Sequence, residues 1–468
     1  MNTLELSASQ IAQHIREGKV SVTDTVEQHI QRIQKVNPRI NAVITPMYDT
    51  ARQQAKDADT HIATHGTDDL PPLFGVPVTI KDSWGIEGVR FTGGSTYHAD
   101  DIAEQDAEVV KRFKEAGAII LGKTNLPDMC WSGETVNPIF GRTNNPHNIN
   151  HSAGGSSGGE GAIIAAGGSP LGIGSDIAGS VRIPAAMNGC VSLKPTHERV
   201  PSHDHFPKPS DQHPDWNTAG PMARRIEDLS LAMSVLSETP FADYREIDLV
   251  NRRCVVYIHN GLVPVRKEVV ETVSTAMGTL KHAGMETVRD DTLPIRDMTF
   301  AYAHLMSKYG NDAFKTALGG GKKYNLWEEI NYIRKGEGRI SANVLNFTHS
   351  MDVFAPMAYL TGGTNSRKVD QYKQQLLSAM GEDGVLLCPI IITTPPKHGW
   401  VYTLITQVPY TTPFNLVGFP AVVLPIGYTK KGLPLAVQIV ARPDEDETAL
   451  AVAAELERVY GGWRMAKM

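Results

Sequence analysis

Cysteine is scarce in this chain, and its few cysteines form no metal or redox motif. The 468 residues include four, Cys130, Cys190, Cys254 and Cys388, which stand far apart and make no CxxC pair. Zinc sites and disulfide frameworks need several cysteines at short, regular spacings. We therefore expect four free thiols that pack as small apolar side chains in a reducing compartment. We expect no metal site and no cofactor.

Long apolar runs and an excess of positive charge are also missing. No stretch of about 18 apolar residues occurs, and Glu5, Arg16 and Glu17 interrupt the first 20 residues. We therefore expect no membrane span and no targeting segment. The formal net charge is −6, whereas a nucleic-acid-binding protein needs a basic surface. The sequence thus predicts a cytoplasmic protein that does not bind nucleic acid as its main ligand.

Short β-branched segments alternate with amphipathic helices along the chain. Strands are expected at residues 76–80, 118–121, 171–174, 384–392, 421–426 and 434–440. The alternation predicts an α/β fold with a mixed, largely parallel twisted central sheet, covered by helices on both faces. Because strands return near the C-terminus, we expect residues 1–468 to form a single domain. Residues from about 200 to 380 read as a variable, mostly helical insertion or lid.

Glycine and serine are concentrated between residues 154 and 182. The segment reads GGSSGGEGAIIAAGGSPLGIGSDIAGSVR, with glycine or serine at almost every other position. Glycine inside a helix or strand costs about 0.5–1 kcal/mol relative to alanine. A sequence accepts that cost where the backbone must approach a ligand closely. Ser156, Ser157 and Ser180 have the tightest glycine contexts, which predicts a nucleophilic serine surrounded by backbone amides.

A phosphate-binding motif is present by letter but not by context. Residues 117–124 fit GxxxxGK[ST]. A P-loop needs a strand before its first glycine and a helix at its Lys-Ser/Thr pair. Here a helix over 106–116 precedes Gly117, and residues 118–121 read as a buried strand. We interpret the match as a helix end followed by a core strand.

A second short motif indicates a different hydrolase. Residues 154–158 fit GxSxG, the nucleophile elbow of α/β-hydrolases, which requires a strand immediately before it. Residues 144–153 contain almost no β-forming side chains. A triad would also need a downstream histidine. The candidates in the following segment are His197, His203, His205 and His213. Several of them lie in the polar, proline-rich stretch 201–217, where we expect solvated histidines. An esterase with Ser156 as nucleophile is the remote alternative.

The whole serine-rich segment resembles a known signature. GGSSGGEGA and GIGSDIAGSVRIPA closely resemble the signature of the amidase-signature family of serine hydrolases. GVPVTIKD, GKTNLPD, GRTNNP, SLKPT and TPFNLVGFPAVVLPIG resemble its flanking segments. The resemblance extends over residues 1 to about 460 and is weakest between 200 and 380. It implies an amidase that cleaves a linear carbon–nitrogen amide bond through an acyl-enzyme.

The resemblance also assigns the catalytic positions. Lys81 matches the family's catalytic lysine, Ser156 its bridging serine and Ser180 its nucleophile. The peptide bond before the bridging serine is cis in the family, so the same is expected of Gly155–Ser156. The oxyanion loop, whose backbone N–H groups point at the developing negative charge, corresponds to Ile177, Ala178, Gly179 and Ser180. Ala178 stands where the family usually has glycine.

Further positions are implied as supporting or substrate-binding. Ser157, Asp176 and Arg182 match family positions, and we expect the last two to hold the loop by hydrogen bonds; a role for Arg182 in binding a substrate carboxylate is a weaker alternative. Met129, Cys130 and Trp131 fall in the segment that lines the family's substrate pocket. Plain core packing would explain these three nearly as well.

The chemistry requires an uncharged lysine. A lysine with its ordinary pKa of about 10.4 is protonated at neutral pH and cannot act as a base. Burial of Lys81 beside serines and glycine backbone, with no carboxylate nearby, would favour the neutral amine. Lys81 could then take a proton from Ser156, which takes one from Ser180 during attack.

Three branches of the family are to be separated. The A subunit of glutamyl-tRNA amidotransferase, a glutaminase, is an alternative, but the chain shows no RYDGVRYG-like segment near its C-terminus. Fatty-acid amide hydrolases share GGSSGGEGA, but their membrane-spanning N-terminus is not seen here. We therefore expect a free-standing amidase for a small-molecule amide, aliphatic, aryl or N-acyl. A homodimer is the assembly that the resemblance suggests.

Overall fold

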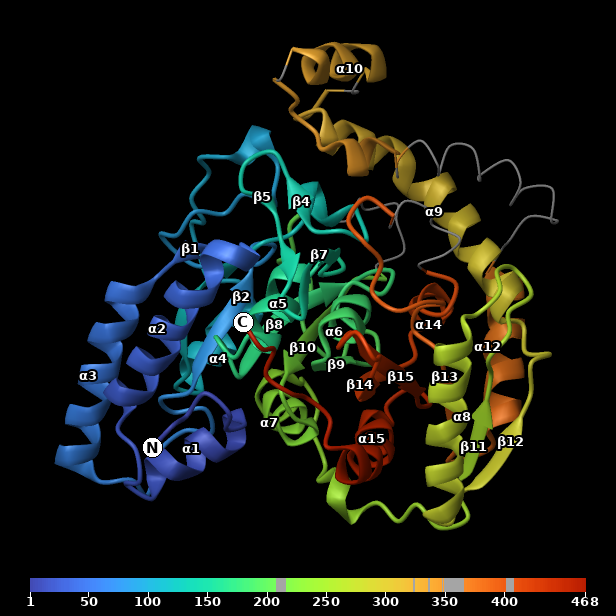
Figure 1. Cartoon of the computed structure of the whole chain (residues 1–468), viewed down its shortest axis with the longest axis horizontal. Helices are drawn as coiled ribbons and strands as arrows, with labels where there is room; N and C mark the ends of the chain where they lie inside the picture. Colours follow the sequence, from blue (N-terminus) through green and yellow to red (C-terminus); the bar gives the residue numbers. More distant parts are fainter. Residues whose placement is uncertain (208–215, 323–324, 336, 347, 349–365, 401–407) are drawn as a thin grey trace.

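The centre of the molecule is one large twisted sheet (Figure 1). The computed structural model describes residues 1–207, 216–322, 325–335, 337–346, 348, 366–400 and 408–468. The strand order is β1-β3-β2-β8-β10-β9-β14-β15-β13-β11-β12. These strands are β1 (Val43–Pro46), β2 (Pro77–Lys81), β3 (Ile119–Thr124), β8 (Leu171–Asp176), β9 (Val191–Lys194), β10 (Thr218–Ala223), β11 (Arg253–Val256), β12 (Glu286–Arg289), β13 (Val385–Cys388), β14 (Ala421–Tyr428) and β15 (Pro434–Val440).

The predicted α/β fold with a mixed sheet is confirmed, with one correction to the strand directions. β2 runs parallel to β3 and β8, and β11 runs parallel to β12 and β13. The strands between these two groups pair antiparallel, from β8 through β10, β9, β14 and β15 to β13. The sheet is therefore not largely parallel. β14 and β15 are joined by a short turn, which forces antiparallel pairing, and a buried apolar run does not reveal its direction.

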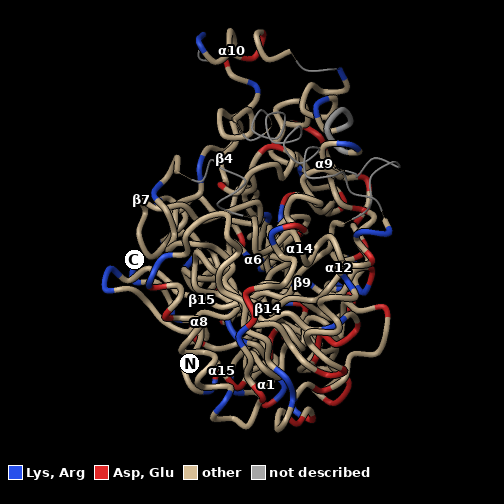
Figure 2. The backbone as a smooth tube through the Cα atoms, turned by 90° about the vertical axis from the view of Figure 1, so that its right-hand side faces the viewer, with Lys and Arg blue, Asp and Glu red and all other residues tan. Residues whose placement is uncertain are grey.

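Residues 200–380 contribute strands to the central sheet as well as helices. We expected a mostly helical insertion, but β10, β11 and β12 from this segment belong to the central sheet. β11 and β12 are only four residues long. β11 buries its last three residues, whereas β12 is mostly exposed and lacks the apolar pattern of a core strand. The helices of the segment are α7 (Ile226–Leu236), α8 (Lys267–His282), α9 (Ile295–Leu318), α10 (Leu326–Arg334) and α12 (Ser366–Met380). Figures 1 and 2 show α10 and the adjoining end of α9 projecting beyond the rest of the molecule.

The N-terminal helices follow their sequence signals closely. Ser7 and Gln10 form a capping box at the start of the first helix. The second helix contains Pro38 in its last turn and ends at Asn41, which has a left-handed conformation. The Asn37 side chain accepts hydrogen bonds from the next two backbone N–H groups beyond that end. These helices are α1 (Ala8–Arg16), α2 (Val22–Ile40), α3 (Tyr48–His65) and α4 (Glu108–Glu115).

Both faces of the central strands are covered. Every residue of β8, β9 and β10 is buried, which requires packing on each face because side chains alternate along a strand. The remaining helices are α5 (Gly158–Ala165), α6 (Arg182–Asn188), α14 (Thr412–Leu416) and α15 (Asp446–Tyr460). α5 packs against α6, and α15 packs against α7, α8 and β14.

The charged residues, the helices and the cysteines can each be compared with what the composition predicts. Figure 2 shows basic and acidic residues interspersed along the chain. No helix in the described ranges is long and apolar enough to cross a membrane. All four cysteines are free, and Cys130 is the one that is half-buried where the others are fully buried.

Candidate active site

The C-terminal ends of three parallel strands meet at one edge of the sheet. β2 ends at Lys81, β3 at Thr124 and β8 at Asp176. In α/β folds this edge is where ligands bind, because the strand ends and the loops that follow them converge there. Lys81 pairs with Thr124 in register, and Ser175 of β8 lies within hydrogen-bond distance of the Lys81 side chain.

Lys81 is completely buried and contacts two serines. Its Nζ lies within hydrogen-bond distance of both, 2.6 Å from Ser156 Oγ and 2.8 Å from Ser175 Oγ. Burial lowers the pKa of Lys81 from its usual value, because an ammonium loses more hydration than a neutral amine. Ser156 is also buried. The structure thus places the predicted residues Lys81 and Ser156 side by side. The sequence did not indicate Ser175 as a second partner of Lys81.

Two carboxyl groups lie near Lys81, contrary to our expectation of none. Asp176 and Glu160 both act to raise the Lys81 pKa, although less strongly than burial lowers it. Glu160 accepts hydrogen bonds from Thr79 Oγ1 at 2.6 Å and Thr124 Oγ1 at 2.9 Å. Burial raises the pKa of Glu160 to about 8, so it is mainly protonated and uncharged at neutral pH. The Asp176 charge is compensated by a buried arginine.

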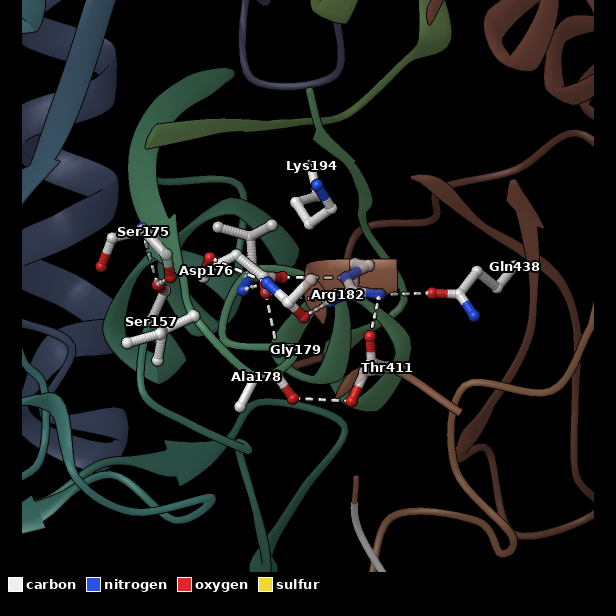
Figure 3. Close-up of polar contacts among 12 residues, drawn as sticks. Ser157, Ser175, Asp176, Ala178, Gly179, Arg182, Lys194, Thr411 and Gln438 are labelled. Carbon is white, nitrogen blue, oxygen red and sulfur yellow. Dashed lines mark hydrogen bonds and ion pairs between the residues drawn. The ribbon is translucent and has the colours of Figure 1, made fainter. Parts of the chain in front are cut away.

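The glycine-rich turn holds Ser156 against β8. The Gly155–Ser156 peptide bond is cis. Ser157, immediately before α5, donates its backbone N–H to the Ser180 carbonyl at 3.1 Å. The Ser157 hydroxyl accepts from the Ser175 N–H and donates to the Ser175 carbonyl, each at 3.4 Å (Figure 3). The two serine-bearing turns are therefore tied to each other through their backbones.

Ser180 lies between β8 and α6 and keeps 9% of its surface exposed. Its hydroxyl has no hydrogen-bond partner among the described residues. Beside it, the Ile177 carbonyl accepts from Tyr302 Oη at 2.8 Å, and the Ala178 carbonyl accepts from Thr411 Oγ1 at 2.6 Å. In a planar trans peptide the N–H points opposite to the carbonyl, so these bonds set the direction of the amides that follow.

In the loop of residues 177–180, one backbone N–H already has a hydrogen-bond acceptor within the protein. The Gly179 N–H donates to Asp176 Oδ1 at 2.7 Å, whereas the N–H groups of Ile177, Ala178 and Ser180 have no partner among the described residues. Gly179 has φ +117°, and a Cβ there would lie 2.6 Å from Thr411 Oγ1, so only glycine fits. Ala178 has no positive φ, and its methyl group is therefore accommodated without backbone strain.

A buried ion pair supports the loop from beneath. Arg182 donates from Nε and Nη2 to the two oxygens of Asp176, each at 2.9 Å (Figure 3). It also donates to the Thr411 carbonyl at 3.1 Å, Gln438 Oε1 at 2.9 Å and Asn415 Oδ1 at 2.5 Å. Both charges are fully buried, and the guanidinium holds the pKa of Asp176 below its usual range. The hydrogen-bonding groups of the pair are thus used within the protein itself.

Replacing Tyr302 with phenylalanine tests the importance of this support. The variant removes the donor to the Ile177 carbonyl but keeps the ring, which packs on Trp216 with centroids 4.7 Å apart. We expect kcat to fall by up to about tenfold, because one hydrogen bond contributes about 0.5–1.5 kcal/mol. Steady-state kinetics should show KM unchanged. A Tyr309→Phe variant on the same helix is the control, and equal kcat values for both variants would contradict the role.

The three predicted pocket residues lie in different surroundings. Met129 and Cys130 have the positive φ values of 52° and 61°, which non-glycine residues rarely adopt. Met129 belongs to a small apolar cluster with Leu318 and residues of 340–345. Trp131 packs against Phe314 of α9, with ring centroids 3.9 Å apart. Cys130 instead lies beside Lys81.

One histidine of the site was assigned wrongly from the sequence. His205 was expected to be solvated in the polar segment 201–217, but it is 5% exposed, and its Nε2 lies 2.9 Å from Ser175 Oγ. The polar neighbours of His205 hid its burial. His197 and His203 are more exposed, with pairing to neighbouring acidic residues. His213 lies outside the described residues.

The two short motifs have other structural roles. The strand expected at 118–121 is the core strand β3, which covers residues 119–124 and includes the Lys-Thr pair, so the P-loop match is accidental. A strand does precede GxSxG, contrary to expectation: β7 (Asn148–Ser152) pairs with β6 (Asn144–Asn145). This ribbon is separate from the central sheet and is held by Asn145, whose side chain donates to the Ser152 and Met187 carbonyls. A nucleophile elbow would follow a strand of the main sheet.

Comparisons with known proteins show the family of this chain. The amidase family profile matches residues 24–450. The chain belongs to the amidase family. It is 34% identical to fatty-acid amide hydrolase 2-B of Danio rerio, covering 98% of this chain and 90% of the relative. It is 29% identical to an acylamidase of Rhodococcus erythropolis, covering 97% and 95%.

A solved structure shows the same overall fold as this chain. 6-Aminohexanoate cyclic dimer hydrolase matches with a TM-score of 0.80 at 27% identity, covering 99% of both chains. The large mixed sheet is therefore the family's fold. Membership of this family makes amide hydrolysis the class of reaction of this chain.

Proposed function

We propose that this amidase cleaves its substrate through an acyl-enzyme on Ser180, with Ser156 as the proton bridge and Lys81 as the base. Ser180 Oγ attacks the amide carbonyl and gives its proton to Ser156 Oγ, whose own proton passes to the neutral Lys81 amine. The reverse transfer protonates the departing amine. Water then attacks the ester on Ser180 by the same route, releasing the acid and free Ser180.

The observation that carries this proposal is the 2.6 Å contact between buried Lys81 and Ser156. A hydroxyl suits the central position because it accepts and donates a proton without holding a charge. Glu160, which is mainly uncharged, and Asp176, which is paired with Arg182, leave the Lys81 amine free of a salt bridge. The base is therefore available without a histidine.

Negative charge on the carbonyl oxygen would be stabilised by the free amides of the loop. The N–H groups of Ile177, Ala178 and Ser180 are the candidate donors, and Gly179 contributes by its shape and its bond to Asp176. Each donor of this kind typically contributes about 2.7–4 kcal/mol to the transition state. Asp176 and Arg182 would hold the loop rather than move protons.

For the substrate we propose an N-acyl amide whose acyl part contacts Met129, Cys130 or Trp131. The relatives are described as hydrolases of fatty-acid amides and as acylamidases. The apolar surroundings of Met129 and Trp131 are compatible with an acyl chain. A series of acyl p-nitroanilides, from acetyl to dodecanoyl, measures the preferred chain length.

Labelling with a fluorophosphonate tests the nucleophile. We expect a single adduct on Ser180 by peptide mapping, absent from a Ser180→Ala variant and still formed, more slowly, by Ser156→Ala. The reason is that only the attacking serine becomes phosphonylated, whereas the bridge affects the rate. An adduct on Ser156 would instead support an esterase with Ser156 as nucleophile and overturn the proposal.

An amidotransferase function has less support. An A subunit of that kind would be a glutaminase, and the C-terminal segment expected of it is missing from this sequence. Release of ammonia from free glutamine by the purified chain, with no turnover of anilides, would favour that function. Cytoplasmic location and homodimer formation remain predictions from the sequence.

A further inference from the structure

His205 contacts the catalytic lysine through one intervening hydroxyl. Its Nε2 lies 2.9 Å from Ser175 Oγ, and that oxygen lies 2.8 Å from Lys81 Nζ. The ring is buried and packs edge-on against Trp84, with centroids 5.0 Å apart. The Cys130 sulfur lies 3.9 Å from the same ring nitrogen, so Ser175 is the nearer partner.

The second ring nitrogen determines which tautomer is present. His205 Nδ1 lies 3.1 Å from the Pro207 carbonyl oxygen. A carbonyl only accepts, so Nδ1 carries the hydrogen. Burial, together with the charge of Lys81 when protonated, lowers the pKa of His205 to about 3. A neutral ring with its hydrogen on Nδ1 leaves Nε2 as an acceptor, and Ser175 must therefore donate to it.

This direction has a consequence for Lys81. A serine hydroxyl has one hydrogen, and Ser175 uses it for the hydrogen bond that it donates to His205. Ser175 can then only accept from Lys81, using one of the two N–H bonds of the neutral amine. Without His205, the Ser175 hydroxyl could turn and donate to the amine lone pair, in competition with Ser156.

We propose that His205 is a positioning residue for amide hydrolysis: by accepting the Ser175 hydrogen, it keeps the Lys81 lone pair available to Ser156. The proposal rests on the Ser180–Ser156–Lys81 mechanism of the proposed function. It gives a role to a histidine that takes no proton from the substrate. His205 acts through Ser175 and lies one hydrogen bond further from the reacting atoms than Lys81.

A His205→Phe variant removes the acceptor and keeps an aromatic ring against Trp84. With an acyl p-nitroanilide as substrate, we expect the plateau value of kcat at high pH, where Lys81 is fully neutral, to fall about tenfold at unchanged KM, because the competing bond must break first. We also expect the rise of kcat with pH to move to lower pH. A hydroxyl that donates to the neutral amine stabilises that form, while the other groups that face Lys81, which are Cys130, Asp176 and Glu160, stay in place.

Three further variants separate positioning from general packing. His205→Gln offers an amide oxygen near the Nε2 position and should recover most of the lost kcat. His203→Phe changes an exposed histidine of the same loop and should behave as wild type. In a Ser175→Ala background, His205→Phe should have no further effect on kcat or on the pH profile, since the competing hydroxyl is gone.

The outcomes distinguish this proposal from the mechanism beneath it. Wild-type kcat and pH profile in His205→Phe, no recovery in His205→Gln, or an equal loss in the Ser175→Ala background would each overturn the role of His205. A Lys81→Met variant is measured in the same series. Full activity of that variant would instead overturn the mechanism itself, whatever His205→Phe does.

Discussion

Replacing Lys81 with methionine is expected to lower amidase kcat by about 10²–10⁴-fold, the usual contribution of a positioned acid or base. The variant removes the proton acceptor for Ser156 and fills the buried space with an apolar chain of similar length. The wild-type contact at 2.6 Å is the reason for expecting so large an effect. Initial rates with an acyl p-nitroanilide measure it, and circular dichroism checks that the fold is kept.

The pH profile provides a second readout of the same residue. Lys81 is active when neutral, so wild-type kcat should rise with pH as its proton is lost. Burial lowers its pKa, which places that rise below the ordinary lysine value of about 10.4. The residual activity of Lys81→Met should not show the rise. A flat wild-type profile between about pH 6 and 10 would contradict a neutral lysine base.

A matched control removes a different buried lysine. Lys194 is also fully buried, but its Nζ donates to the Pro195 carbonyl at 2.8 Å and forms no hydrogen bond with a serine of the described ranges. Lys194→Met should therefore keep turnover of the wild-type order. If both methionine variants lose activity equally, the loss in Lys81→Met reflects the removal of a buried lysine rather than of the base.

Replacing Arg182 with methionine is expected to lower the free energy of unfolding by about 3–5 kcal/mol, because it leaves the Asp176 carboxylate buried and unpaired. Asp176 would retain its bonds to the Gly179 and Val181 N–H groups and to Asn415. These bonds come from neutral groups, so they do not replace the two hydrogen bonds that the charged guanidinium donates. The midpoint of urea unfolding, followed by tryptophan fluorescence, measures the change.

An exposed arginine serves as the comparison. Arg245 makes the same two-pronged contact with Asp243, but its side chain is 75% exposed. Arg245→Met should change the free energy of unfolding by at most about 1 kcal/mol. Equal midpoints for the Arg182→Met variant and the wild type would show that the buried pair does not stabilise the fold. Arg182→Lys keeps the charge but loses the paired N–H donors of the guanidinium. Its unfolding midpoint should lie between those of Arg182→Met and the wild type.

Much of the architecture could be predicted because it depends on neighbours in the chain. The helix before Gly117, the core strand that follows it and the strand that begins at Ala421 each arise from residues within a few positions of one another. Strand direction could not be predicted in the same way. β10 lies between β8 and β9 and antiparallel to both, an order that depends on contacts between distant segments.

The carboxyl groups and His205 show the same limit within the site. Glu160 lies 79 positions from Lys81 in sequence, and it is mainly uncharged because the fold buries it, although the hydrogen bonds from Thr79 and Thr124 favour its charged form. His205 stands among polar residues, and no local pattern indicates that its ring is buried against Trp84. Both residues were missed because burial is a property of the packed molecule.

The sequence by itself determined which groups are present and in what order: a lysine at a strand end, a serine in a glycine-rich turn and a serine before a short helix. Those features depend on local spacing and backbone preference. The tertiary structure alone decided that Lys81 contacts two serines, that the Gly179 N–H is used by Asp176, and that His205 faces Ser175. Protonation and hydrogen-bond direction depend on burial and on partners distant in the chain, and only folding creates these.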